Sequence, residues 1–321
     1  MKTIHSFCTL GAFILVQLFV GCVSEHPAWK GVPDIYQGIK YQELERTEPR
    51  LMKTFVMRVD LQTKGLKFTG TPRADHWGEQ MPDFDRYKCS VRTRLQRTAD
   101  FMREQRKPVE EGGRGRNLVV AINTEPWEPF ESPFTNKYAY VYSPMISDGV
   151  VVSAGSTGGG AVFVVNKDGS AQITKGITAT QSSNIWVAAT GFNIIMTNGV
   201  DIAKKDDFKL APRTAFGLSK DNRYLYLMAI DGRQEGWSLG ANMHDICKLM
   251  TELGANDAMN MDGGGSTTLV RWDEETENAV VCNRQSTNGF TRAVAASVGI
   301  YFEDGVKYKA KSRKKEGKKG E

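Results

Sequence analysis

The sequence predicts a single α+β domain with a mixed, largely antiparallel β-sheet and flanking helices. Most apolar segments are short and are separated by turn residues, as at Lys167-Asp168-Gly169, which is typical of hairpins. Fewer segments repeat apolar residues at helical spacing. No segment with the composition of a linker interrupts residues 49–304. Together these observations predict one unit in which strands dominate and helices cover the sheet.

The N-terminal segment is typical of a bacterial export signal. Lys2 precedes an almost wholly apolar run at residues 9–20, which is too short to span a bilayer comfortably. The run ends in Phe19-Val20-Gly21-Cys22, which resembles the lipobox of bacterial lipoproteins. We therefore expect residues 1–21 to be a signal peptide and Cys22 to be acylated. The protein would then be exported and membrane-anchored, in the periplasm or at the cell surface; a plain secretory signal is the alternative.

The segments around the predicted domain are weakly patterned. Residues 22–49 are interpreted as a tether and lead-in segment, and the domain is expected over 50–305. The tail, residues 306–321, has eight basic and two acidic residues, so the rest of the chain is close to −1 within a net charge of +5. Because the chain outside the tail has no surplus of basic residues, nucleic-acid binding is not expected. The tail is interpreted as a disordered extension, and the lipid anchor as the only membrane contact.

The first half of the domain contains alternating and helical patterns. Residues 54–60 alternate between apolar and polar side chains, which predicts a strand. Apolar residues at helical spacing predict a helix over 88–104. Residues 118–122 form a continuous apolar run, which is expected to be a strand buried on both faces.

The second half consists mainly of hairpins and one clear helix. Apolar residues recur at helical spacing from Met243 to Leu253, and Gly254 follows, where glycine commonly ends a helix. Cys247 lies on the apolar face and is interpreted as a buried thiol. Hairpins are expected at residues 163–173 and 214–230. Further strands are expected at residues 191–197, 258–261, 267–270 and 294–301.

The most informative motif is Asn260-Met261-Asp262-Gly263-Gly264-Gly265-Ser266-Thr267-Thr268. It places an acid at the end of a predicted strand, followed by three glycines whose N–H groups can converge on an anion. Ser266 and Thr267 add hydroxyl donors. No lysine follows the glycines, so a nucleotide-binding P-loop is not expected. A glycine-rich hairpin without a ligand is the alternative interpretation.

Four further motifs place polar side chains where predicted strands begin or end. An arginine at such a position can bind phosphate in a planar, bidentate way, and ligands tend to gather at strand ends. Each motif alone is weak. The motifs are Ala121-Ile122-Asn123-Thr124-Glu125, Ala211-Pro212-Arg213-Thr214, Ala229-Ile230-Asp231-Gly232-Arg233 and Asn288-Gly289-Phe290-Thr291-Arg292.

Together, in this order and over roughly residues 50–302, the five motifs resemble the phosphodiester glycosidase family. The resemblance implies hydrolysis of a sugar-1-phosphodiester at C1, with release of the sugar and a phosphomonoester. Phosphorylated glycans or cell-envelope polysaccharides are the expected substrates. One segment departs from the family pattern, in which a small residue and then aromatic residues follow the asparagine. Here the segment is Asn123-Thr124-Glu125-Pro126-Trp127, so the sugar itself is not predicted.

The chemistry of such a reaction assigns roles to the motif residues. We expect Asp262 and Asp231 to be the catalytic carboxylates, with Glu125 as a third candidate, and donors to hold the phosphate charge. The nucleophile, the acid or base and the stereochemical outcome stay open. The expected substrate-binding residues are Asn123, Arg213, Thr214, Arg233, Gly263, Gly264, Gly265, Ser266, Thr267 and Arg292.

Two alternatives remain open at this point. Asp231, Asp262 and Asn123 offer hard oxygen ligands that would suit Ca²⁺ or Mg²⁺, although no cofactor is required by the pattern. The same pocket could also belong to a non-catalytic lipoprotein that binds anionic glycans. The oligomeric state is not predicted.

Overall fold

A computed structural model describes residues 25–82, 89–131, 136–155, 160–177, 179–287, 290–304 and 306. The expected signal peptide, Cys22 and residues 307–321 of the expected tail lie outside the described residues. Asn288 and Gly289 of the last motif also lie outside them. Among the helices that the structure describes, none is long and apolar enough to cross a membrane.

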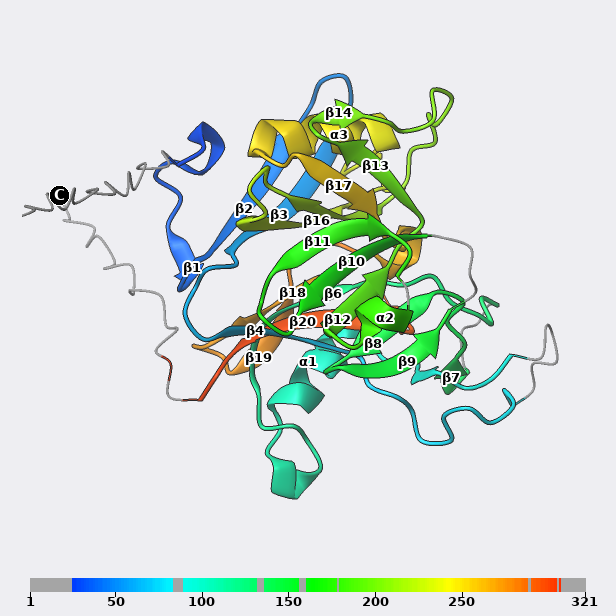
Figure 1. Cartoon of the computed structure of the whole chain (residues 1–321). Coiled ribbons are helices and arrows are strands. Elements are labelled where there is room, and N and C mark those ends of the chain that lie inside the picture. Colours follow the sequence, from blue (N-terminus) through cyan, green and yellow to red (C-terminus); the bar gives the residue numbers. More distant parts are fainter. Residues whose placement is uncertain are drawn as a thin grey trace, which may run out of the picture.

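Antiparallel sheets are the main regular structure of the described chain (Figure 1). The large sheet has, in spatial order, β1 (Asp34–Tyr36), β2 (Ile39–Arg46), β3 (Met52–Asp60), β16 (Tyr224–Ile230), β15 (Arg213–Leu218), β17 (Asp257–Asn260), β13 (Asn193–Thr197) and β14 (Val200–Asp201). The β10 sheet has β11 (Ala171–Lys175), β10 (Ala161–Asn166), β12 (Ile185–Thr190), β8 (Pro144–Ser147) and β9 (Val150–Ala154). The β6 sheet has β19 (Asn278–Val281), β18 (Leu269–Asp273), β6 (Asn117–Asn123), β20 (Ser297–Phe302) and β4 (Leu66–Gly70).

The remaining elements are short. β5 (Thr93–Arg94) pairs with β7 (Tyr138–Ala139). The α-helices are α1 (Thr98–Arg106), α2 (Ala179–Ser182) and α3 (Met243–Leu253). Single 3₁₀ turns lie at Pro27–Trp29, Val109–Glu111 and Gly264–Ser266.

One apolar core joins the three larger sheets. Phe163 of the β10 sheet packs edge-on against Phe216 of the large sheet, with ring centroids 5.3 Å apart. On its other side Phe163 contacts Phe68 of the β6 sheet, at 6.2 Å. All three rings are buried, and such edge-to-face contacts are favourable beyond the area they bury. The sheets therefore share a single interior and form one unit.

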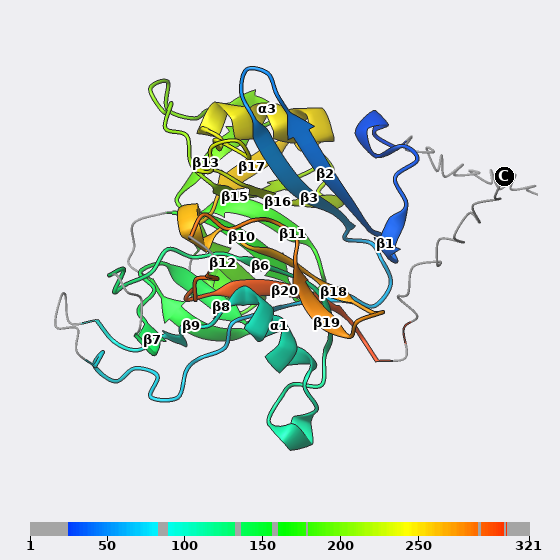
Figure 2. The ribbon, with the colours of Figure 1, turned by 180° about the vertical axis from the view of Figure 1, so that it is seen from behind.

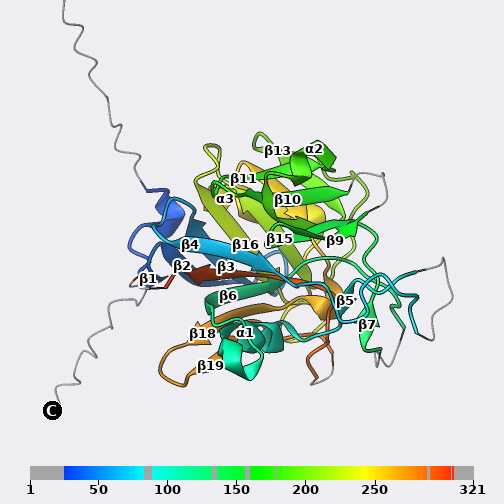
Figure 3. The same ribbon diagram turned by 60° about the horizontal axis from the view of Figure 1, so that its bottom comes forward.

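Two helices cover outer faces of the sheets (Figures 2 and 3). The apolar face of α3 packs on the large sheet, and α1 packs on the β6 sheet. Asn242 and Asp245 form a capping box at the start of α3, and Gly254 ends it with a φ of 99°, a conformation that glycine adopts without strain. The predicted helix and its glycine end are confirmed, and the Cys247 thiol is buried.

The predicted α+β class with flanking helices is wrong, because strands take up 42% of the chain and helices only 12%. The helix expected over 88–104 is largely replaced by extended chain. Residues 93–94 pair with β7, Gln96 bridges to Val294, and α1 begins only at Thr98. Apolar residues three or four apart do not distinguish a helix from an extended segment whose partners lie far along the chain.

Other local patterns are confirmed. The expected hairpins are β10–β11 and β15–β16, and the buried run at 118–122 lies inside β6. The segment interpreted as a tether contains β1 and β2, which extend the large sheet. Many of the side chains of β2 are polar, as suits a strand near a sheet edge, and this hid the strand from hydropathy patterns.

The two ends of the described chain lie at the same side of the molecule (Figures 1 and 2). The first turn, Pro27–Trp29, and the end of β20 are at the left of Figure 1, whereas the turn that follows β17 is at the right. The rear view shows the same separation.

Candidate active site

The sheet registers bring the ends of several strands to one edge. Arg213 begins β15 and pairs with Ile230, the last residue of β16. Asn260 ends the neighbouring strand β17, and Asn123 ends β6 of the adjacent sheet. Four of the five motifs found in the sequence contain these residues. The antiparallel pairing brings the three motifs of the large sheet to one edge, and Asn123 joins them from the adjacent sheet through its hydrogen bond with Thr214.

The buried Asn123 amide connects the two sheets at this edge. Its Oδ1 accepts hydrogen bonds from Thr214 Oγ1 at 2.8 Å and from the Thr268 N–H at 3.0 Å. Its Nδ2 donates to the Asp262 carbonyl at 2.7 Å. Because the Asn123 side chain and Thr214 Oγ1 are used in this way, both residues hold the site together from behind. Neither of them lines the cleft described below.

The glycine turn is shaped by close contacts with its neighbours. Gly264 has a φ of 62°, and a Cβ added there would lie 3.2 Å from Arg233 Nη1. A Cβ at Gly265 would lie 2.6 Å from the Arg292 guanidinium carbon. The N–H groups of Gly264, Ser266 and Thr267 donate to backbone carbonyls. Because the glycines lack side chains, Arg233 and Arg292 can lie close to the turn. The N–H groups that are bonded to carbonyls are not available to a ligand.

A cleft of about 290 Å³ opens in front of this turn. Asp262 and the three glycines form one wall, and Arg213, Arg233 and Arg292 approach from other segments. Arg213 Nε donates to the Ala241 carbonyl at 3.0 Å, which fixes the side chain. Burial lowers the pKa of Arg213 and Arg292, but an arginine remains charged at neutral pH. The lining of the cleft thus combines one carboxylate with three arginines and Lys209.

Several buried polar atoms around the cleft complete no hydrogen bond within the described part of the chain. They are Asn260 Oδ1, Asp262 Oδ2, Ser266 Oγ and Thr267 Oγ1. Burying such atoms without a partner is costly. Their grouping at one turn therefore indicates a place that is completed by water or by a bound polar molecule.

Asp262 and Glu125 have unusual ionisation. Burial raises the pKa of Asp262 to about 7, against the opposing effects of the Ser266 hydroxyl and the Arg292 charge. Asp262 is partly exposed as a whole, but its Oδ2 atom is buried. Burial also raises the pKa of Glu125 to about 7, although Thr124 and Thr190 donate hydrogen bonds to it, and the Asp262 charge adds to the increase. Near pH 7 the two groups should hold about one proton between them.

Glu125 lies behind the cleft. Its side chain is 1% exposed, its Oε1 accepts a hydrogen bond from the Thr190 N–H at 2.9 Å, and its Oε2 accepts one from the Thr124 hydroxyl. Asp262 is the carboxylate that faces the cleft, and its charge adds to the raised pKa of Glu125.

Asp231 is engaged in structural hydrogen bonds. Its Oδ2 accepts from Trp237 Nε1 at 2.8 Å, and its Oδ1 accepts from Asn283 Nδ2 at 3.1 Å. The Arg284 N–H lies 3.0 Å from both oxygens. Burial raises the pKa of Asp231 while these donors lower it. The carboxylate is fully buried and holds two loops together outside the cleft.

No metal cluster is formed by the described residues, since no group of three or more His, Cys, Asp or Glu side chains converges there. Of the three oxygen ligands that the sequence offered to a cation, Asn123 and Asp231 are engaged in the hydrogen bonds described above. Asp262 alone faces the cleft.

The structure brings some of the sequence candidates together and separates others. Those that line the cleft are Arg213, Arg233, Asp262, Gly263, Gly264, Gly265 and Arg292. Asn123, Thr214, Glu125, Asp231, Ser266 and Thr267 are buried around it. The cleft also contains Phe130, Phe192 and Lys209, which belong to none of the motifs. The two phenylalanines are about half exposed, and an apolar side chain in a loop was the only signal that could have pointed to them.

The fold is similar to those of solved structures. The catalytic domain of zebrafish N-acetylglucosamine-1-phosphodiester alpha-N-acetylglucosaminidase, auto-inhibited by pro-peptide, gives a TM-score of 0.57 at 16% identity, covering 85% of this chain and 87% of that one. A hypothetical protein from Synechocystis gives a TM-score of 0.53 at 12% identity, and the match covers 83% of this chain and 62% of that one. A putative exported protein from Burkholderia pseudomallei gives a TM-score of 0.50 at 12% identity, and the match covers 78% of this chain and 74% of that one. A comparison with curated proteins found no match.

The fold and the site define an antiparallel β protein with a carboxylate and arginines in one cleft, an arrangement that suits an anionic ligand. The family model for phosphodiester glycosidase matches residues 116–301, which is more than half of the chain. The chain therefore belongs to the phosphodiester glycosidase family, and the resemblance found in the sequence is confirmed. The family implies a glycan phosphodiester as substrate.

The two aspartates should differ in their effect on stability. Asp231→Asn places an N–H group against the donors of Trp237 and Arg284, so we expect the free energy of unfolding to fall by about 2 kcal/mol. Asp262→Asn removes a carboxylate whose ionisation is disfavoured by burial, and we expect no decrease in the free energy of unfolding. Urea unfolding at pH 8 measures both changes. Equal losses in the two variants would contradict the structural role of Asp231.

Stability should also depend on pH through the Asp262 carboxylate. The folded-state pKa of Asp262, about 7, lies above its ordinary value of 3.8, so the folded protein holds a proton that the unfolded chain has released. We therefore expect the free energy of unfolding to fall as the pH rises from about 4 to about 7. Asp262→Asn should weaken this dependence in urea titrations. An unchanged dependence would show that Asp262 titrates normally.

Proposed function

We propose that the protein hydrolyses a sugar-1-phosphodiester in the Asp262 cleft, releasing the sugar and a phosphomonoester. One observation carries the proposal: Asp262 is the only carboxylate among the described residues that line the cleft, and it lies among Arg213, Arg233 and Arg292. Family membership supports glycosidase chemistry. Phosphorylated glycans or cell-envelope polysaccharides are the proposed substrates.

The arginines supply the binding of the phosphate. A diester carries one negative charge, and the charge on the phosphate increases as the bond to C1 breaks. Arginine side chains held by protein contacts, as Arg213 is by Ala241, can stabilise that charge without reorganising. Because the leaving phosphate is a weak base, these cations reduce the need for a strong general acid.

Asp262 acts on the sugar side of the bond. The transition state at C1 resembles an oxocarbenium ion, which a nearby carboxylate stabilises. In the hydrolytic step the oxygen of water bonds to C1, the phosphomonoester leaves with the bonding electrons, and Asp262 takes up the proton of the water. The pKa of Asp262, about 7, makes its carboxylate a stronger base than an ordinary aspartate while leaving much of it ionised at neutral pH.

Glu125 and Asp231 are proposed as positioning residues. Glu125 is buried behind Asp262 and accepts a hydrogen bond from the Thr124 hydroxyl. Because the Thr124 carbonyl accepts a hydrogen bond from the Asp262 N–H, Glu125 helps to position the backbone beside Asp262. Asp231 fixes the loops that carry Arg233 and Arg284. Of the three oxygen ligands discussed above only Asp262 faces the cleft, and the proposal assigns no step to a metal ion.

Substitution of Asp262 tests the proposal. With a synthetic N-acetylglucosamine 1-(methyl phosphate), we expect Asp262→Asn to lower kcat by about a thousandfold or more. Arg213→Ala should lower kcat/KM because the phosphate loses a cation. The measurement is the rate at which each variant and the unaltered protein release sugar from the diester. Asp257→Asn, at the other end of β17, is the matched control and should retain full activity.

Two results would overturn the proposal. Full activity in Asp262→Asn would remove Asp262 from the reaction. Saturable binding of the diester by the unaltered protein without release of sugar, measured by calorimetry, would favour the other function considered from the sequence, which is binding of anionic glycans without turnover.

We also propose that the protein is exported and anchored through acylated Cys22, on the strength of the sequence Phe19-Val20-Gly21-Cys22. When the full chain is expressed in a bacterium, Cys22→Ala should move the protein from the membrane fraction to the soluble fraction. Mass spectrometry of the unaltered protein should find the lipid on an N-terminal cysteine. A mature chain that begins elsewhere would refute the anchor.

A further inference from the structure

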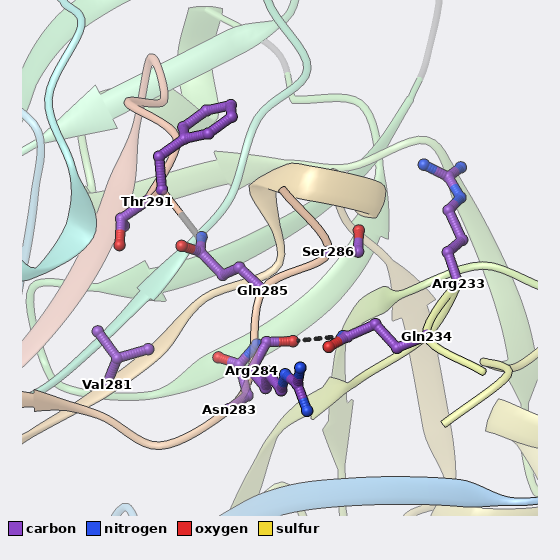
Figure 4. A pocket seen from close by; sticks show the side chains of 9 residues that line it. Arg233, Gln234, Val281, Asn283, Arg284, Gln285, Ser286 and Thr291 are labelled. Carbon is purple, nitrogen blue, oxygen red and sulfur yellow. Dashed lines mark hydrogen bonds between the residues drawn. The ribbon is translucent and has the colours of Figure 1, made fainter. Parts of the chain in front are cut away.

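A second pocket, of about 360 Å³, adjoins the cleft and shares Arg233 with it. Its other polar residues include Gln234, Arg284, Gln285 and Ser286, and Figure 4 shows Arg233 standing apart from Arg284. Phe290 also contributes to it and is 54% exposed. Among the described lining residues there is no carboxylate. The pocket therefore has binding groups but no candidate acid or base of its own.

The wall of this pocket is firmly built. The Arg284 N–H donates to the buried Asp231 carboxylate, and the Arg284 carbonyl accepts a hydrogen bond from Gln234 Nε2 at 2.9 Å (Figure 4). Gln285 Nε2 donates to Thr268 Oγ1, next to the glycine turn. These bonds hold the backbone of Arg284 and Gln285 in place. Arg284 is exposed, and its guanidinium lies over the Trp237 ring, 5.4 Å from the ring centroid.

The pocket carries two arginines that form no ion pair among the described residues, although the charge of Arg284 acts on the buried Asp231 carboxylate. Neither Arg233 nor Arg284 forms an ion pair with a carboxylate among the described residues, whereas many other arginines, such as Arg223 with Asp60, do so. The chain without its tail is close to −1, so this is a local surplus. Ser286 Oγ is buried and completes no hydrogen bond in the described chain. Two unpaired cations and an unused hydroxyl indicate an anionic, polar ligand.

We propose that this pocket is a second subsite, which binds the neighbouring unit of a glycan whose repeating units are joined by phosphodiesters. The proposal rests on the function proposed above and names its substrate class. Arg284 would hold the phosphate of the next unit. Phe290 offers an apolar ring to the sugar, and the side-chain carbonyl oxygens of Gln234 and Gln285 can accept hydrogen bonds from its hydroxyls. Arg233 lies between the two units, at the boundary that both pockets share.

A single-stranded nucleic acid is the competing ligand for a basic pocket. Such binding normally uses several aromatic side chains in series along a positively charged groove. Here the described lining contains one aromatic residue, Phe290, and the body of the chain has no basic surplus. The observations therefore favour a phosphate-linked glycan.

Binding measurements on the Asp262→Asn protein test the subsite without turnover. The probes are N-acetylglucosamine 1-(methyl phosphate) and an oligomer of N-acetylglucosamine joined through 1-phosphodiesters. We expect the oligomer to bind at least about tenfold more tightly, because a second charge-assisted contact is made. Adding Arg284→Ala should abolish that difference and leave binding of the single diester unchanged. This variant keeps the backbone N–H that Asp231 binds, so the loop should remain folded.

Arg114→Ala is the matched control, because Arg114 is also exposed but lies outside both pockets; it should leave the preference for the oligomer intact. Equal affinity for the two probes would overturn the proposal of a second subsite. An equal loss of affinity for both probes in Arg284→Ala would also overturn it. So would equally tight, Arg284-dependent binding of a DNA oligonucleotide with the same number of phosphates. These outcomes differ from failure of the proposed function, in which the unaltered protein hydrolyses neither probe.

Discussion

The arrangement of the site depends on one buried amide. Asn123 is fully enclosed and bonds to Thr214 of the large sheet, to the Thr268 N–H and to the carbonyl of Asp262. A buried side chain with three satisfied hydrogen bonds tolerates little displacement, because each broken bond would leave a polar atom without a partner. The amide thereby fixes where the glycine turn leaves the sheet. The Asp262 carboxylate takes its position from that turn, and Arg233 and Arg292 lie against its glycines.

The turn also shows how the protein holds like charges together. Its glycines let two guanidinium groups approach the backbone, and Arg292 favours ionisation of the nearby Asp262. Burial outweighs that effect, so the pKa of the carboxyl group stays high. The folded state therefore keeps a charge arrangement that is unfavourable without a ligand, as is common where a protein binds or transforms one.

Local patterns in the sequence predicted the elements that depend on local interactions. Helix α3 carries its own cap and glycine end, and β15 and β16 are neighbours in both sequence and space. The extended chain before Thr98 was mistaken for helix because its partners, at residues 138–139 and 294, lie far away. Within the site, the motifs indicated which residues gather but not where each side chain points. Asp231 faces inward because its donors come from Trp237, Asn283 and Arg284, which no spacing rule connects to it.

The placement of the chain ends has a consequence for how such a protein would meet its substrate. The described N-terminal turn lies at the side of the molecule opposite the glycine turn. If the proposed lipid on Cys22 is present, the far side of the molecule from that lipid would carry the cleft beside the glycine turn. Long polymers projecting from the same or a facing surface could then enter it from solution, whereas head groups lying in the plane of the supporting membrane would be out of reach.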